Sequence, residues 1–161
     1  IGSSAMQGWR KDMEDQHIVT QLPSLPDHVF LAVFDGHGGQ GAAIYAERHM
    51  ISVIVSTEGY NEYVSSEEKD PKALGVILTA AFMRIDVMLR AHQDATFRSD
   101  CSGCTAVSCV ITPNHYICAN AGDSRCVLAT DGRAEPMSYD HKPTDKEERN
   151  RIINAGGVVR M

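Results

Sequence analysis

Acidic side chains and glycines gather in two short stretches, and these are the residues whose types and spacing could do chemistry. Glu14 and Asp15 stand just before a strand-like run, with Arg10 a few residues earlier, and Asp35 ends an apolar run and precedes Gly36. Carboxylates in one cleft repel one another unless a divalent cation neutralises them, and Mg²⁺ or Mn²⁺ prefers oxygen ligands. Gly36 lacks a Cβ, so its carbonyl can turn toward such an ion. Each piece alone has an ordinary explanation as a turn or solvated surface, so the prediction depends on their meeting in space.

The cysteines offer a second kind of chemistry, which the sequence does not favour. The chain has five of them, all in one central segment: Cys101, Cys104, Cys109, Cys118 and Cys126. An odd number cannot pair fully within the chain, so a reducing intracellular compartment, cytoplasmic or nuclear, is expected. The Cys101-x-x-Cys104 pair has no second pair at metal spacing, so we interpret these cysteines as small core residues rather than zinc ligands or redox groups.

Composition sets the broad class. The chain has 161 residues, a formal charge of -6, 43% apolar residues and 22% charged residues. This profile is typical of one soluble globular domain, or a large part of one, in which folding buries roughly 70% of the unfolded surface. No basic cluster predicts a nucleic-acid partner, and no apolar run approaches the ~20 residues of a membrane span. The oligomeric state stays open.

The elements that must position the acidic stretches alternate between strands and helices. We expect strands at 4–7, 16–22, 29–34, 105–112, 116–120 and 126–129, with a turn at 23–27 and the last three strands forming an antiparallel meander. An amphipathic helix is expected over 40–55, and a second, with a broad buried face, begins at Pro71 with Asp70 as its N-cap. Residues 58–70 read as a polar surface connection. Thr144 and Glu147 form a capping box for a last helix that ends before Gly156-Gly157.

Six short motifs occur in order along the chain, and together they are specific. They are Arg10-x-x-Met13-Glu14-Asp15, Phe34-Asp35-Gly36-His37-Gly38-Gly39, Ser102-Gly103-Cys104-Thr105-Ala106, Asn120-Ala121-Gly122-Asp123-Ser124-Arg125, Asp140-His141-Lys142-Pro143 and Ala155-Gly156-Gly157-Val158-Val159. In these motifs the chain resembles the protein phosphatase 2C family of metal-dependent serine/threonine protein phosphatases. One departure is Cys104, where the family usually has serine, which we interpret as a near-isosteric core change.

The resemblance implies an α+β fold, an α-β-β-α sandwich of two antiparallel sheets flanked by helices. It covers residues 1–161 as the N-terminal portion of a single catalytic domain that is truncated at the C-terminus. Two further aspartates of the family's metal site, in an Asp-Gly and an Asp-Asn motif, would then follow Gly157. An alternative therefore stays open, in which the chain is a non-catalytic binding module or inactive relative.

The resemblance also implies residue roles. Asp35 would bridge two Mg²⁺ or Mn²⁺ ions, and the other protein groups at the metals would be Glu14, the Gly36 carbonyl, Asp15 through bound waters, and Asp123 at a third, weaker metal. Arg10 would bind the phosphate and His37 would act as general acid. The two ions would activate a water that attacks phosphorus in a phosphoserine or phosphothreonine protein, with no cysteine nucleophile. His141 is interpreted as structural.

Overall fold

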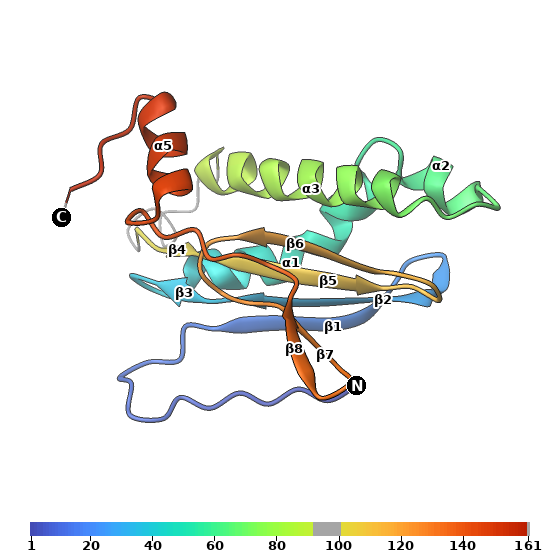
Figure 1. The fold of residues 1–161 in the computed structure, drawn as a ribbon, viewed down its shortest axis with the longest axis horizontal. Coiled ribbons are helices and arrows are strands. Elements are labelled where there is room, and N and C mark those ends of the chain that lie inside the picture. Colours follow the sequence, from blue (N-terminus) through green and yellow to red (C-terminus); the bar gives the residue numbers. More distant parts are fainter. Residues whose placement is uncertain (92–100, 161) are drawn as a thin grey trace.

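The computed structural model describes residues 1–91 and 101–160, and its centre is a four-stranded antiparallel sheet (Figure 1). The strand order is β1-β2-β5-β6, and the strands are β1 (Gln16–Leu22), β2 (Leu25–Phe34), β5 (Ala106–Ile111) and β6 (Tyr116–Ala121). The sequence placed β1 at its observed bounds and β5 and β6 within a residue or so of theirs. The α+β class with antiparallel sheets is confirmed.

The β1–β2 hairpin is tighter than the sequence suggested. Only Pro23 and Ser24 form the turn, and Ser24 adopts a φ of 62°. β2 begins at Leu25, so the predicted turn over 23–27 was too long. Leu25 is 4% exposed, and the Gln21 side-chain amide donates to the Pro26 carbonyl at 2.9 Å, which holds the two strands together up to the turn.

Two long helices pack on one face of this sheet. They are α1 (Gly41–Val55) and α3 (Pro71–Ala91), and they also pack against each other. The expected stripe on α3 supplies its buried residues: Leu74, Ile77, Leu78, Ala81 and Ile85. Asp70 caps α3 as predicted, because its Oδ1 accepts the Lys72 backbone N–H at 2.9 Å. The apolar period therefore gave both helices and their buried sides.

The segment before α3 contradicts the expected polar connection. It contains a short helix, α2 (Tyr60–Ser65), in which Tyr60 is 2% exposed and Tyr63 is 4% exposed. The Tyr60 hydroxyl donates to the Pro23 carbonyl at 2.6 Å, and the Tyr63 hydroxyl lies 2.9 Å from Nε2 of buried His28. Two tyrosines with satisfied hydroxyls thus anchor a segment whose other residues are mostly polar.

Two short strand pairs complete the β structure. β3 (Gly36–His37) pairs with β4 (Gly103–Cys104), and β7 (Val127–Thr130) pairs with β8 (Arg133–Pro136). The β7–β8 turn has positive φ at both Asp131 (50°) and Gly132 (72°), as a two-residue type I′ turn requires. The predicted meander is wrong at this point, because in the described chain β7 pairs with β8 and not with β6.

The four-stranded sheet thereby has two unlike faces. The helix-covered face carries Ile18, Phe30, Ala32, Phe34 and Val110 of the core. The helix-free face carries the alternate residues Val19, Leu31, Val33, Val107, Cys109 and Cys118, and no described helix packs on it. The β7–β8 hairpin and the N-terminal segment lie on that side in Figure 1. Residues 4–7 form no strand there, contrary to expectation.

The last helix stands at one end of the sheet. α5 (Lys146–Asn154) has Asp145 rather than Thr144 at its N-cap position, and no side-chain cap bond forms, so the expected capping box is wrong. The predicted stop is confirmed, because Gly156 adopts a φ of 82° and its N–H donates to the Ile153 carbonyl at 2.9 Å. Within the described residues, no helix has the length and hydropathy needed to span a membrane.

Candidate active site

The candidate site is built at the end of β2, where the buried strand stops and the glycine loop begins. Asp35 follows Phe34, which is fully buried, so its carboxylate lies at the end of the sheet where β2 stops. The next two residues form β3, with Gly36 opposite Cys104 and His37 opposite Gly103. This short ladder places the motif at 34–39 beside the motif at 102–106, although the two are nearly 70 residues apart in the sequence.

Thr105 fixes Asp35 and connects it to a further motif. The Asp35 backbone N–H donates to Thr105 Oγ1 at 3.3 Å, and the Thr105 N–H donates to the Asp35 carbonyl at 2.9 Å. Thr105 Oγ1 also lies 2.6 Å from the Ser124 hydroxyl. At Gly122, whose φ is 111°, a Cβ would lie 2.6 Å from the Thr105 Cβ. A glycine is thus required there, and the loop carrying Asp123 packs directly on Thr105.

Gly36 is required for a reason that the sequence did not reveal. A Cβ at this position would lie 2.4 Å from the Glu14 carbonyl oxygen and 3.1 Å from the Glu14 Cβ. The residue is therefore glycine because the chain around Glu14 crosses it closely. The Glu14 Oε1 accepts the Gly39 N–H at 2.6 Å, so this carboxylate also holds the glycine loop.

The electrostatics at Asp35 bring together four of the other predicted residues. Burial raises the Asp35 pKa, and the nearby carboxylates of Asp15 and Asp123 raise it further. Arg10 and His37 act in the opposite direction. Repulsion among three carboxylates, with one cation and one imidazole nearby, is the charge pattern expected of residues that share a functional site.

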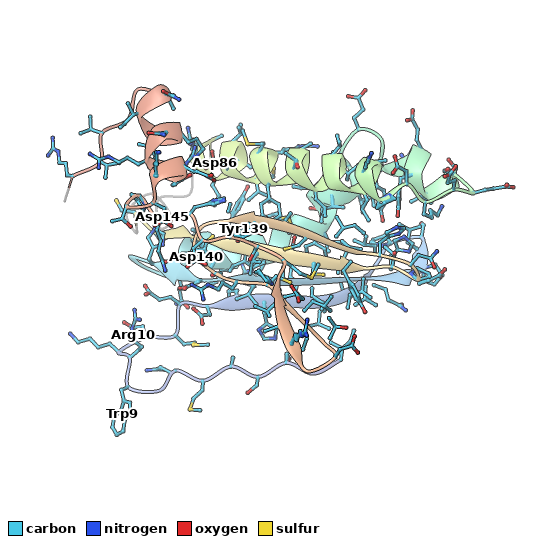
Figure 2. All side chains as sticks on the ribbon, in the orientation of Figure 1. Trp9, Arg10, Asp86, Tyr139, Asp140 and Asp145 are labelled. Carbon is cyan, nitrogen blue, oxygen red and sulfur yellow. The ribbon has the colours of Figure 1, made fainter. Side chains whose placement is uncertain are left out.

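The two expected catalytic side chains are both exposed. His37 packs its ring against Gly103, where a Cβ would lie 2.5 Å from the imidazole Nε2. Arg10 lies in the loop before β1, and Figure 2 shows it next to Trp9, whose side chain points away from the body of the protein. The Gln7 side-chain amide donates to the Arg10 carbonyl at 2.8 Å, which shapes this loop.

A second charged group lies beside the Asp123 loop, and sequence reasoning gave it no role. Arg125 donates to both oxygens of Asp140, at 2.6 and 3.0 Å, and Lys142 Nζ lies 2.7 Å from the same carboxylate. These partners hold the Asp140 pKa well below its usual range. His141 is structural as predicted, because its backbone N–H donates to the Gly122 carbonyl and its Nδ1 accepts the Gly122 N–H.

A hydroxyl from a distant loop caps α1, and this too escaped the sequence analysis. The α1 N-cap residue, Gln40, makes no side-chain cap bond, whereas Ser102 Oγ accepts the Ala42 N–H at 2.9 Å. The motif that supplies β4 and Thr105 thus also fixes the start of α1. A hydroxyl at position 102 is the sequence signal, but its target becomes apparent only in the fold.

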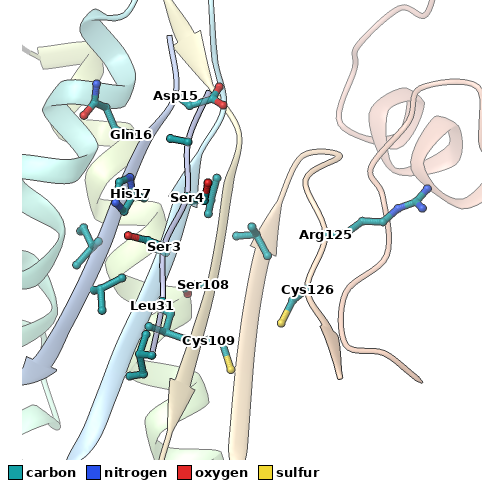
Figure 3. Close-up of a pocket in the computed structure, with 18 of the residues that line it drawn as sticks. Ser3, Ser4, Asp15, Gln16, His17, Leu31, Ser108, Cys109, Arg125 and Cys126 are labelled. Carbon is teal, nitrogen blue, oxygen red and sulfur yellow. The ribbon is translucent and has the colours of Figure 1, made fainter. Parts of the chain in front are cut away.

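The described residues do not form a finished metal centre. Among residues 1–91 and 101–160, no three His, Cys, Asp or Glu side chains are grouped to hold an ion. The large cavity of about 490 Å³ lies elsewhere, on the helix-free face, and Asp15 is the one predicted site residue in its lining (Figure 3). The fold thus brings the predicted residues near one another and leaves their carboxylates apart.

Comparison with known proteins identifies the family. The family model described as protein phosphatase 2C matches residues 1–161. Protein phosphatase 2C homolog 2 of Saccharomyces cerevisiae is 42% identical over 167 residues, which cover 100% of this chain and 34% of that protein. Protein phosphatase 1B of Rattus norvegicus is 39% identical over 163 residues, covering 98% of this chain and 42% of that protein. This chain belongs to the protein phosphatase 2C family.

A solved structure supports the fold independently. The serine-threonine phosphatase 2C from Toxoplasma gondii superposes with a TM-score of 0.76 at 22% identity, covering 91% of this chain and 51% of that one. At this identity the likeness concerns the fold alone. The chain spans roughly a third to a half of the length of the relatives named here.

Proposed function

We propose that this chain supplies part of the active site of a metal-dependent phosphatase that hydrolyses phosphoserine and phosphothreonine in proteins. Family membership supports this proposal, and one observation carries it for these residues. Asp35 lies where Asp15, Asp123, Arg10 and His37 all act on its charge. Three carboxylates that repel one another, with one guanidinium and one imidazole nearby, suit cation-assisted chemistry on a phosphate.

The proposed metal ligands are oxygen donors only, which fits Mg²⁺ or Mn²⁺. When bound, two such ions would supply an activated water as nucleophile. Asp35 would contact both ions, with Glu14 and the Gly36 carbonyl beside it, Asp15 orienting bound waters, and Asp123 serving a third ion. The raised Asp35 pKa supports this assignment, because repulsion from two neighbouring carboxylates is what a bound cation would relieve. Aspartates C-terminal to this chain would complete the ligand set.

Two exposed side chains would act on the substrate itself. Arg10 would bind the phosphate through its guanidinium fork, in a site where bare carboxylates would repel a dianion. His37 would donate a proton to the departing serine or threonine oxygen. The cysteine nearest the site has no role in this scheme, because burial and Asp35 raise the Cys104 pKa to about 11, which keeps it a neutral thiol.

The cellular setting is part of the same proposal. The partners would be phosphoproteins inside the cell, in the cytoplasm or nucleus. The five cysteines, all within the described residues, form no disulfide, which agrees with a reducing compartment.

Metal binding tests the proposed ligands directly. Calorimetric titration with Mn²⁺ should show binding to the wild-type chain that Asp35→Asn weakens at least tenfold. Asp131→Asn is the matched control, because Asp131 lies on the exposed β7–β8 turn and asparagine tolerates its φ of 50°. Equal Mn²⁺ affinity in wild type and Asp35→Asn would contradict the assignment.

The reaction itself is tested in the full-length protein. His37→Gln should slow hydrolysis of a phosphothreonine peptide by about 10² to 10⁴, and slow an aryl phosphate much less, because an alkoxide leaving group needs an acid more than a phenolate does. Equal slowing would make His37 a positioning residue. No Mn²⁺-dependent hydrolysis by the wild-type protein would favour the non-catalytic alternative.

A further inference from the structure

Three of the five cysteines meet on the helix-free face, away from the candidate site. Cys109 on β5 lies directly opposite Cys118 on β6, at the end of a row that runs across the sheet through Val19 and Leu31. Directly opposed residues of antiparallel strands have Cβ atoms about 4.5–5.5 Å apart, so these two thiols are neighbours. The third cysteine, Cys126, comes from outside the sheet, just before β7.

Cys126 lies beside both members of this pair. Its thiol is close enough to Cys109 and to Cys118 to raise the pKa of each. Cys109 and Cys126 both line the 490 Å³ cavity, in which Figure 3 shows them reaching in from the sheet and from the hairpin side. We call Cys109, Cys118 and Cys126 the thiol cluster.

The backbone holds Cys126 in this position. Its N–H donates to the Ser138 hydroxyl at 2.9 Å, and its carbonyl accepts the Met137 N–H at 2.9 Å. Ser138 is itself buried, at 7% exposed. The backbone bonds around Cys126 therefore hold the start of the β7–β8 hairpin beside the four-stranded sheet.

Two members of the cluster are neutral thiols at neutral pH, so neither is a ready metal ligand and neither is suited to attack a peroxide first. Burial and the neighbouring thiols, chiefly Cys126, raise the pKa of Cys109 to about 11 and that of Cys118 to about 12. Within the described residues, the three thiols are not arranged to hold a metal ion. Neighbouring thiols can still be joined by oxidation, at a rate limited by their small thiolate fraction. The phosphate chemistry proposed above uses none of them.

We propose that the thiol cluster is a site of reversible oxidation, at which a hydroperoxide joins Cys126 to one of the two strand cysteines. The Cys126 sulfur attacks the peroxide oxygen and becomes a sulfenic acid, releasing water or an alcohol. The sulfur of Cys109 or Cys118 then displaces the hydroxyl group, which leaves as water with that thiol's proton, and a disulfide remains. Two thiols are oxidised and one peroxide is reduced.

The cross-link would tie the β7–β8 hairpin covalently to the four-stranded sheet. Cys126 directly follows Arg125, whose guanidinium holds Asp140, and lies three residues after Asp123. Oxidation would therefore restrain the chain that leads out of the Asp123 loop. This inference does not depend on the phosphatase proposal, because it uses none of the side chains proposed to bind metal or substrate.

Peptide mapping tests the proposal, because trypsin separates Cys126 from the other cysteines. Cleavage after Arg98, Arg125 and Arg133 gives a peptide 99–125 with four cysteines and a peptide 126–133 with Cys126. The folded protein is exposed to millimolar hydrogen peroxide, its remaining thiols are blocked, and the digest is mapped by mass spectrometry. We expect a species joining the two peptides, loss of two of the five titratable thiols, and recovery of both with dithiothreitol.

Variants identify the partners. Cys126→Ser should abolish the joined species, as should the double variant Cys109→Ser, Cys118→Ser. The controls Cys101→Ser and Cys104→Ser should leave it unchanged. Cys126→Ala, checked like the other variants by far-UV circular dichroism, shows whether loss of the joined species reflects misfolding. Peroxide treatment of the wild-type protein in 8 M urea should lower the yield of the joined species at least fivefold. A disulfide confined to peptide 99–125, oxidation only to sulfinic or sulfonic acid, or an equal yield in urea would overturn the proposal.

Discussion

The two faces of the four-stranded sheet share one set of strands yet differ in what covers them. On β2, Phe30 and Phe34 point to the helices and are fully buried, whereas Val33 points the other way and is 45% exposed. The same holds on β1, where Ile18 is 9% exposed and the next residue, Val19, is 45% exposed. On β1 and β2, alternation therefore separates buried residues that stabilise the fold from residues that are partly exposed to solvent.

The candidate site belongs to neither face, because it forms at the end of the sheet where β2 stops. Its fixed points are close backbone approaches and hydrogen bonds, such as those that Thr105 makes to Asp35. Phe34, on the helix-covered face, is buried immediately before Asp35 and so fixes this end of the sheet. Residues that stabilise the core and residues of the candidate site are thus adjacent in sequence but depend on different interactions. Paired substitutions can therefore separate effects on stability from effects on the site.

The largest effect is expected from emptying the helix-covered face. Phe30→Ala removes a fully buried aromatic ring from beneath the helices, and should lower the free energy of unfolding by about 3–5 kcal/mol. Val33→Ala, on the same strand but facing away, should lower it by only about 0.5 kcal/mol. Urea denaturation followed by circular dichroism measures both. Similar losses from the two substitutions would show that the faces are equally packed.

A smaller effect on stability is expected from a methyl group added at the candidate site, compared with a methyl group added in a helix. Gly36→Ala places a methyl group against the Glu14 carbonyl, and should cost about 1–3 kcal/mol of unfolding free energy as well as weaken Mn²⁺ binding. Gly75→Ala is the matched control, because nothing lies within 4 Å of its would-be Cβ in α3. It should stabilise the protein by about 0.5–1 kcal/mol, since alanine favours a helix interior. Stabilisation by Gly36→Ala would contradict the observed approach of Glu14.

The regular elements were readable from the sequence where one local pattern decided the outcome. Alternation and apolar runs gave β1 and most of β2, and the apolar period gave α1 and α3. The short helix α2 was missed because its burial depends on tertiary partners: Tyr60 reaches the Pro23 carbonyl, and Tyr63 reaches His28. A six-residue segment carries too little periodicity to reveal such contacts.

The sequence proposes the candidate site as a set of residues, whose roles stay predictions, and it does not give the geometry of the site. The motifs named Asp35 and Gly36, and the structure gives Gly36 a different justification, the close crossing of Glu14. Thr105 could not be chosen in advance, because its role requires Asp35 and Ser124 to approach it from separate parts of the chain. Long-range hydrogen bonds of this kind leave no spacing rule in the sequence.

His28 allows the helix-covered face to be examined through pH. It is 2% exposed, its Nε2 lies 2.9 Å from the Tyr63 hydroxyl, and its Nδ1 has no partner in the described structure. Burial lowers its pKa below the ordinary 6.5, with Lys69 also lowering it and Asp27 opposing the shift. The folded protein therefore resists a proton that the unfolded chain accepts as soon as the pH falls below about 6.5.

This difference predicts the sign of a pH dependence confined to one side chain. Stability from neutral His28 is fully present above pH 6.5 and is lost as the pH falls toward the lowered folded-state pKa. His28→Gln, whose amide can still meet the Tyr63 hydroxyl, should flatten the fall in unfolding free energy between pH 6.5 and 5, by less than the ~1.4 kcal/mol per pH unit that one proton allows. Urea midpoints across this range measure the slopes, and exposed His115→Gln should leave the wild-type slope unchanged. Parallel slopes for wild type and His28→Gln would mean that His28 titrates alike in both states, and that the helix-covered face does not exclude its charge.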